Sequence, residues 1–269
     1  EKSIEAAGWL DKGNGEFLEP YVAFWQGYWS MYTYALHLGG RYEKELEIAQ
    51  EWKRRFPRTE EWAVQAEAKA RIGLGQLEGL APVIDDWRAA QPSRLEYLWK
   101  LADELWVHGH HDAARRLLEG EVQRFDSDPA YVGRLNNQAM VLHRLGRNQE
   151  AHTLWEAGID LDKPKPWPWG VARIGFSAAL TGDTAQAREM ERFLLTLQPD
   201  SPVDEVYLPF LQAQIAAALG EKDRAVRILD AWGRSGKMLF WLNNLHGNFT
   251  LQSLLGDYPA FQELLRSKD

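Results

Sequence analysis

The chain has 269 residues, 45% of them hydrophobic, which is enough for a core in one large domain or two small ones. With 31 Lys plus Arg against 39 Asp plus Glu, the formal net charge is −8, and this disfavours nucleic acid or an anionic membrane as partner, because phosphate binding needs clustered cations. Cysteine is absent, which excludes disulfides, thiol catalysis and thiolate metal sites.

The chain opens with residues 1–20, of which Glu1 to Asp11 read as helix. We predict a partial helix of a preceding repeat, or an N-terminal cap, in a mature form or an excised piece. No signal-peptide pattern and no run of about 18 apolar residues is present. We therefore expect no membrane insertion and a soluble protein. Its compartment stays open, with the cytoplasm favoured over the periplasm.

Aromatic residues crowd the next segment, from Tyr21 to Tyr34. Their density on both faces of a helix predicts that the helix is buried or covered by a partner. Contact with an upstream repeat and self-association are equally open, so the oligomeric state stays unknown. The aromatic residues are Tyr21, Phe24, Trp25, Tyr28, Trp29, Tyr32 and Tyr34.

A repeat of 34 to 38 residues runs through residues 21–237. In each unit a glycine ends one apolar helical run and precedes a second, as expected for a tight turn where a positive φ favours glycine. Prolines separate the pairs, and Pro82 and Pro209 should delay or kink their helices. The turn glycines are Gly40, Gly75, Gly109, Gly146, Gly182 and Gly220.

Small residues recur at two fixed distances from these glycines, where two helices of a hairpin approach most closely. Seven residues before the glycine stand Thr33, Ala68, Ala102, Ala139, Gly175 and Ala213. Five residues after it stand Glu45, Leu80, Ala114, Ala151, Ala187 and Ala225. No alternation with the period of a strand appears between them. The pattern predicts an all-α chain of six helical hairpins, with Glu45 and Leu80 departing from the small-residue rule.

This combination of glycine, later alanine and terminal proline resembles the tetratricopeptide repeat, best in Gly175, Gly182, Ala187 and Pro199. The resemblance implies an α-α superhelix of six pairs over residues 21–237, with the first two hairpins splayed or crossing at a different angle. Residues 238–269 break the period and predict short capping helices, over Met238 to Leu245 and Thr250 to Leu265. The run from Leu254 to Arg266 is similar to the end of repeat regions fused to bacterial serine/threonine kinases, winged-helix regulators and cyclases.

The family resemblance implies which side chains line the concave face, and therefore where a ligand would bind. The set mixes aromatic rings with amides and single charges, which suits a ligand that needs apolar area and a few hydrogen bonds. Packing of the same aromatic residues against neighbouring helices is the alternative. The predicted residues are Trp62, Gln65, Lys69, Trp99, Asp103, Asn136, Asn137, Met140, Trp169, Arg173, Phe176, Tyr207, Phe210 and Gln214.

Two smaller patterns are weaker signals. Family members can hold a terminal carboxylate with lysine, arginine and asparagine, and only fragments of such a clamp appear, in Asn136, Asn137, Arg144 and Arg173. The run from His108 to Asp112 contains three histidines on a turn rather than on one helical face. It predicts a solvated turn with Asp112 at a helix start, and no metal site.

The expected function is binding or sensing, with a protein segment on the concave face, as the regulatory part of a larger bacterial signalling protein. No motif for a nucleophile elbow, a phosphate-binding loop or a zinc protease occurs, so we expect no catalytic residues, no cofactor and no enzyme activity in this piece. The alternatives are a small-molecule or sugar sensor in the same groove and, more remotely, an α/α-toroid carbohydrate-active enzyme.

Overall fold

The computed structural model describes residues 26–56, 60–90, 96–127, 135–163, 166–197, 202–235, 245 and 247–266. Across these residues the regular structure is helical and no strand occurs, which confirms the all-α prediction. The chain divides into two compact units, Glu1–Gly109 and His110–Asp269, and each is described by itself. The predicted N-terminal segment 1–20 and most of the predicted helix from Met238 lie outside the described residues.

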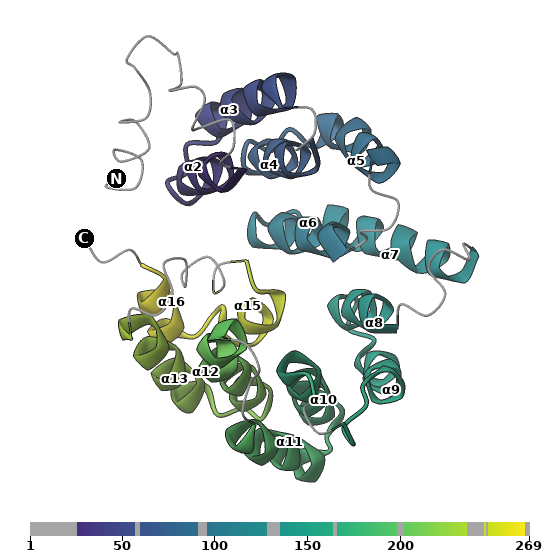
Figure 1. Ribbon diagram of the computed structural model, residues 1–269, viewed down its shortest axis with the longest axis vertical. Coiled ribbons are helices and arrows are strands. Elements are labelled where there is room, and N and C mark those ends of the chain that lie inside the picture. The colour runs from purple at the N-terminus through teal and green to yellow at the C-terminus, as the bar shows by residue number, and fades with distance from the viewer. Residues whose placement is uncertain are drawn as a thin grey trace. The chain divides into compact units, whose positions relative to one another are not determined.

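Unit 1 consists of helical hairpins packed side by side (Figure 1). Helix α4 is central, since it contacts α2, α3, α5 and α6. Trp29 stacks on Trp52, with ring centroids 6.1 Å apart, and Phe56 meets Trp29 edge-on. Its elements are α2 (Gln26–Leu38), α3 (Tyr42–Arg55), α4 (Glu60–Gly73), the 3-10 turn η2 (Leu77–Gly79), α5 (Leu80–Ala90) and α6 (Glu96–Val107).

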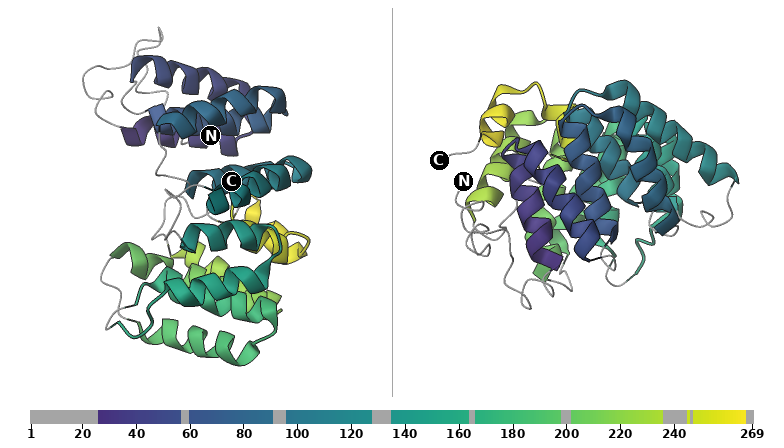
Figure 2. Two further views of the ribbon diagram at one scale, coloured as in Figure 1. Left: turned by 90° about the vertical axis from the view of Figure 1, so that its right-hand side faces the viewer. Right: turned by 90° about the horizontal axis from the view of Figure 1, so that it is seen from above.

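Unit 2 continues the hairpin pattern and ends in two short helices (Figure 2). Each hairpin packs on the next through α9 with α10 and α10 with α12, while α15 packs on α12 and α16 on α13. No helix within the described ranges is both long and apolar enough to cross a membrane. The elements are α7 (His111–Ser127), α8 (Leu135–Arg144), α9 (Asn148–Gly158), α10 (Pro168–Thr181), α11 (Thr184–Thr196), α12 (Pro202–Ala218), α13 (Lys222–Arg234), α15 (Phe249–Leu255) and α16 (Pro259–Leu265).

The predicted turn glycines are the described glycines with positive φ, from 65° at Gly40 to 93° at Gly182. At Gly146 the amide donates to His143, and the next amide, of Arg147, donates to the Leu142 carbonyl. This pair of bonds satisfies carbonyls at the end of α8 and reverses the chain into α9. The turn prediction is therefore confirmed at all six positions.

The predicted small residues are all buried. A Cβ atom on Gly175 would lie 2.7 Å from Cδ1 of Ile215 and 2.9 Å from Cβ of Met190, so the hairpin contact leaves no room for it. Leu80 is also buried, as the first residue of α5, and Pro82 falls in that helix's first turn, where its missing amide costs nothing. Pro209 lies inside α12 without ending it.

Candidate functional site

Unit 1 holds five of the residues predicted to line a concave face, and most of them pack inside the unit. Trp62 lies against the core around Trp29, and Asp103 is buried. Gln65 lines a small recess beside Trp87 and Leu101. Lys69 lies 3.3 Å from the Glu104 carboxylate, and Trp99 is partly buried. Lys69 is therefore joined to a polar cluster that the sequence analysis did not predict.

In unit 2 the predicted aromatic residues belong largely to the core. Trp169, Tyr207, Phe210 and Trp232 form one ring cluster, with centroid distances between 5.1 and 6.2 Å. Phe210 is 2% exposed, and its helix carries it into the contact between α10, α12 and α13. These rings therefore pack against neighbouring helices, which is the alternative to lining a concave face.

Phe176 and Gln214 are buried too, and Met140 is partly buried against the core. Phe176 packs edge-on against Trp155, 5.3 Å away. Gln214 donates to Asn248, whose side chain in turn caps the start of α15. Asn137 is partly buried as well, which leaves Asn136 and Arg173 of the predicted set in unit 2.

Two arginines give unit 2 its clearest binding chemistry. The Arg173 guanidinium donates to Oδ1 of Asn136 at 2.5 Å and lies 4.7 Å from the centre of the Trp167 ring, which is 47% exposed. Burial, and then the positive charge of Arg144, lower the pKa of Arg173 to about 10. Arg173 forms no ion pair with a carboxylate of the described residues. Of the four clamp-like residues, the structure thus joins Arg173 to Asn136 by a hydrogen bond and to Arg144 through its charge.

The short helix α15 packs beside Arg144. Phe249 lies under the Arg144 guanidinium, with 5.6 Å from Cζ to the ring centre, and meets the His143 ring edge-on. Thr250 is 3.0 Å from Nε2 of His143. The C-terminal segment therefore contacts α8 as well as α12, and Phe249 lies against Arg144.

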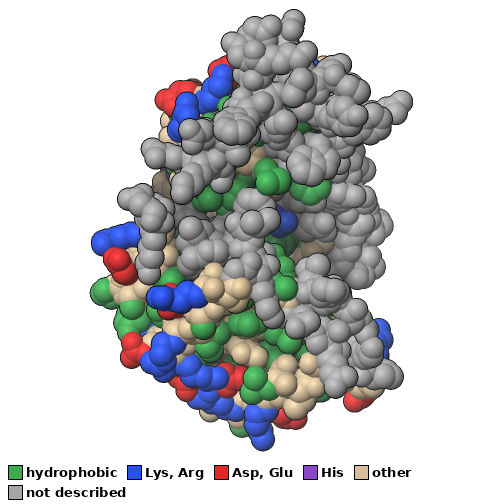
Figure 3. Space-filling model, turned by 60° about the vertical axis from the view of Figure 1, so that its left-hand side comes forward, with side chains coloured by type: hydrophobic (Ala, Val, Ile, Leu, Met, Phe, Trp, Pro, Cys, Tyr) green, Lys and Arg blue, Asp and Glu red, His purple; other side chains and the backbone are tan. Residues whose placement is uncertain are grey.

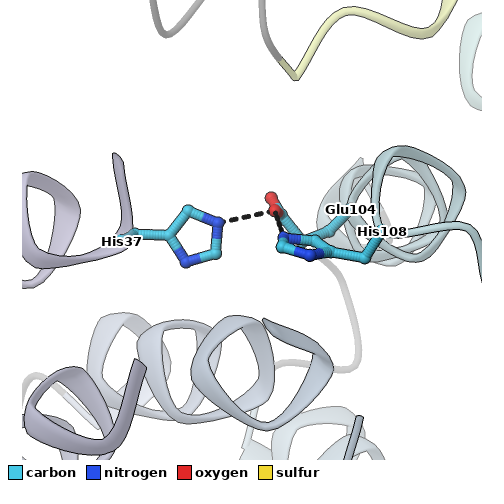
Figure 4. Close-up of side chains that lie close together, drawn as sticks. All are labelled: His37, Glu104 and His108. Carbon is cyan, nitrogen blue, oxygen red and sulfur yellow. Dashed lines mark hydrogen bonds and ion pairs between the residues drawn. The ribbon is translucent and has the colours of Figure 1, made fainter. Parts of the chain in front are cut away.

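A second polar cluster lies in unit 1 (Figure 4). His37, at the end of α2, has Nδ1 2.8 Å from Glu45 and Nε2 2.7 Å from Oε1 of Glu104. His108, just after α6, has Nε2 3.2 Å from the same oxygen. Lys69 approaches the other oxygen of that carboxylate. His37, Glu45 and Glu104 are each no more than 5% exposed.

Electrostatics in this cluster favour the charged forms of His37 and Glu104 despite burial. Burial alone would lower the pKa of His37, but hydrogen bonds to Glu104 and Glu45, and their charges, raise it to about 9. Burial works against ionisation of Glu104, yet Lys69, His108 and His37 hold its pKa well below the usual range. Burial raises the pKa of Glu45 even with His37 beside it.

The histidine run behaves only partly as predicted. Gly109 forms the turn and Asp112 lies in the first turn of α7, as expected. His108, however, is not a solvated turn residue, because its side chain is 15% exposed and faces Glu104. The neighbours of His108 are not its companions in the histidine run, because they come from α2 and from one turn earlier in α6.

On the face shown in Figure 3, the described basic side chains lie among acidic ones. No protein-family model, curated protein or solved structure matches the chain in the comparisons with known proteins. The residues and their geometry therefore carry the functional argument.

Proposed function

We propose that the chain is a tetratricopeptide-type interaction module that binds a protein segment through an anionic group, at Arg144 and Arg173 of unit 2. The observation that carries this proposal is the partly buried Arg173, oriented by Asn136, influenced by a second guanidinium and joined to no described carboxylate. As the sequence pattern indicates, this module would serve as the regulatory part of a larger bacterial signalling protein.

The physical reason is that the charge of Arg173 is unfavourable where it lies. Burial is the main cause of its lowered pKa, the positive charge of Arg144 adds to it, and a carboxylate bound by the two cations would offset both. Guanidinium groups hold carboxylates through two parallel hydrogen bonds, and one hydrogen bond to a charged group contributes about 1.5–3 kcal/mol. The exposed ring of Trp167 offers apolar area next to this charge, as peptide binding requires.

A peptide selection tests the proposal. A random library with free C-terminal carboxylates is selected on the full chain, and enriched peptides are measured by fluorescence anisotropy. We expect enrichment of peptides with a carboxylate, at the C-terminus or in a side chain, and a roughly 10- to 100-fold loss of affinity in Arg173→Gln. Arg173→Lys should lose less, because it keeps the charge.

Arg192→Gln is the matched control, because Arg192 is exposed on α11 and its Nε donates to a carbonyl of its own helix. Equal binding by wild type and Arg173→Gln, or a selection that enriches no sequence, would refute the proposal. Thermal-shift assays against metabolites and sugars address the sensor alternative, which requires a shift that Arg173→Gln abolishes.

A further inference from the structure

The buried cluster of unit 1 contains a set of groups typical of metal ligands. One nitrogen from His37, one from His108 and one oxygen from Glu104 all lie within 4.8 Å of one another (Figure 4). Two imidazoles and a carboxylate are donors that zinc and related divalent cations bind. Glu104 and His108 are four residues apart, so one helical turn brings them to the same face.

Glu45 is not one of the three ligand residues, but its position next to His37 supports a metal site. Its carboxylate lies 2.8 Å from Nδ1 of His37, which leaves Nε2 directed at Glu104. A metal-binding histidine usually donates its other ring N–H to a carboxylate, which fixes the ring and strengthens the ligand. Five residues after the turn glycine, four later hairpins have alanine. Glu45 is therefore a buried acid at a position where the fold needs only a small residue.

Two of the three distances between ligand atoms lie close to those of a metal site, and the third, between the nitrogens of His37 and His108, is at most 4.8 Å. Ligand atoms about 2.0 Å from a tetrahedral zinc ion lie about 3.3 Å from one another. The His108–Glu104 distance of 3.2 Å already fits, and the His37–Glu104 distance of 2.7 Å needs about 0.6 Å of separation. Such a change is within the range of side-chain rotation at the end of α2.

We propose that His37, Glu104 and His108 bind one divalent transition-metal cation, represented by Zn²⁺, with Glu45 orienting His37. The ion would join the end of α2 to α6, and three protein ligands would leave a fourth position for water or another donor. Lys69 holds the other oxygen of Glu104, so Glu104 would bind through Oε1 alone. The positive charge of Lys69 weakens the site without blocking it.

Calorimetry with Zn²⁺ on the chelator-treated full chain tests the site. We expect one saturable equivalent and a higher thermal midpoint, because a ligand that binds the folded state stabilises it. His108→Gln should remove this binding, and Glu45→Gln should weaken it about 10- to 100-fold. His108 is preferred over His37 for the test because its side chain is less buried.

His111→Gln is the control, since His111 is exposed on α7 and outside the cluster. It should bind Zn²⁺ as the wild type does. Circular dichroism establishes that each variant is folded before titration. The proposal is overturned if the wild type shows no saturable equivalent, if folded His108→Gln binds equally well, or if His111→Gln removes the binding.

Discussion

Gly175 offers the most direct test of how the hairpins pack. Alanine in its place gains about 1 kcal/mol of helix propensity, because glycine is the poorer helix former. It also places a Cβ 2.7 Å from Ile215 and 2.9 Å from Cβ of Met190. Ile215 can turn its Cδ1 away, but Cβ of Met190 moves only with the backbone of α11.

Overpacking of a close contact costs about 1–3 kcal/mol, and the fixed position of Met190 puts this site at the upper end. After subtraction of the propensity gain, we expect Gly175→Ala to lower the free energy of unfolding by about 2 kcal/mol. Gly120 is the matched control, since it also lies inside a helix of unit 2 and a Cβ added there would meet no atom within 4 Å. Gly120→Ala should stabilise by about 1 kcal/mol.

Urea unfolding followed by circular dichroism measures both variants, which should share the wild-type dependence on urea. The expected difference between them is about 3 kcal/mol, with opposite signs relative to wild type. If Gly175→Ala stabilises as much as Gly120→Ala does, the small residue is not required at the hairpin contact, and the physical basis of the repeat register is wrong.

Three further predictions concern a turn, a buried histidine and an ion-pair network. Gly182→Ala should lower stability by about 1–2 kcal/mol, read as a lower melting temperature, because φ is +93° although its Cβ has space. Burial lowers the pKa of His143 to about 4 in the folded state. The unfolded state therefore binds more protons than the folded state between about pH 6.5 and 4, and lowering the pH through this range should reduce the free energy of unfolding by up to roughly 3 kcal/mol. His143→Gln should flatten that part of a stability–pH profile. Glu191→Gln should cost about 1 kcal/mol in urea unfolding, and less in high salt, because buried Glu191 pairs with the partly exposed Arg188 and Arg224. A pH profile unchanged by His143→Gln, or a cost at Glu191 independent of salt, would contradict the respective reasoning.

The hairpin turns could be predicted because each depends on a local property. A positive φ at Gly146 excludes most other residues, and the buried contact at Ala151 excludes large ones, so both constraints appear in the sequence at constant spacing. The depth of the aromatic residues could not be predicted in this way. The register places Phe210 on the first helix of its pair, but its 2% exposure depends on Trp169 from the preceding hairpin and on Trp232 from the second helix of its own hairpin.

The polar cluster of unit 1 shows a different limit. His37 and Glu104 are 67 residues apart, and no local period links them. The sequence nevertheless contained a signal in Glu45, which occupies a position where a small apolar residue suffices. Burying a carboxylate costs several kcal/mol unless it is paired, so an acid at such a position requires a partner on a facing helix. A departure from a repeat's packing rule is therefore informative when the new residue is costly to bury: Leu80 needs only space, whereas Glu45 needs His37.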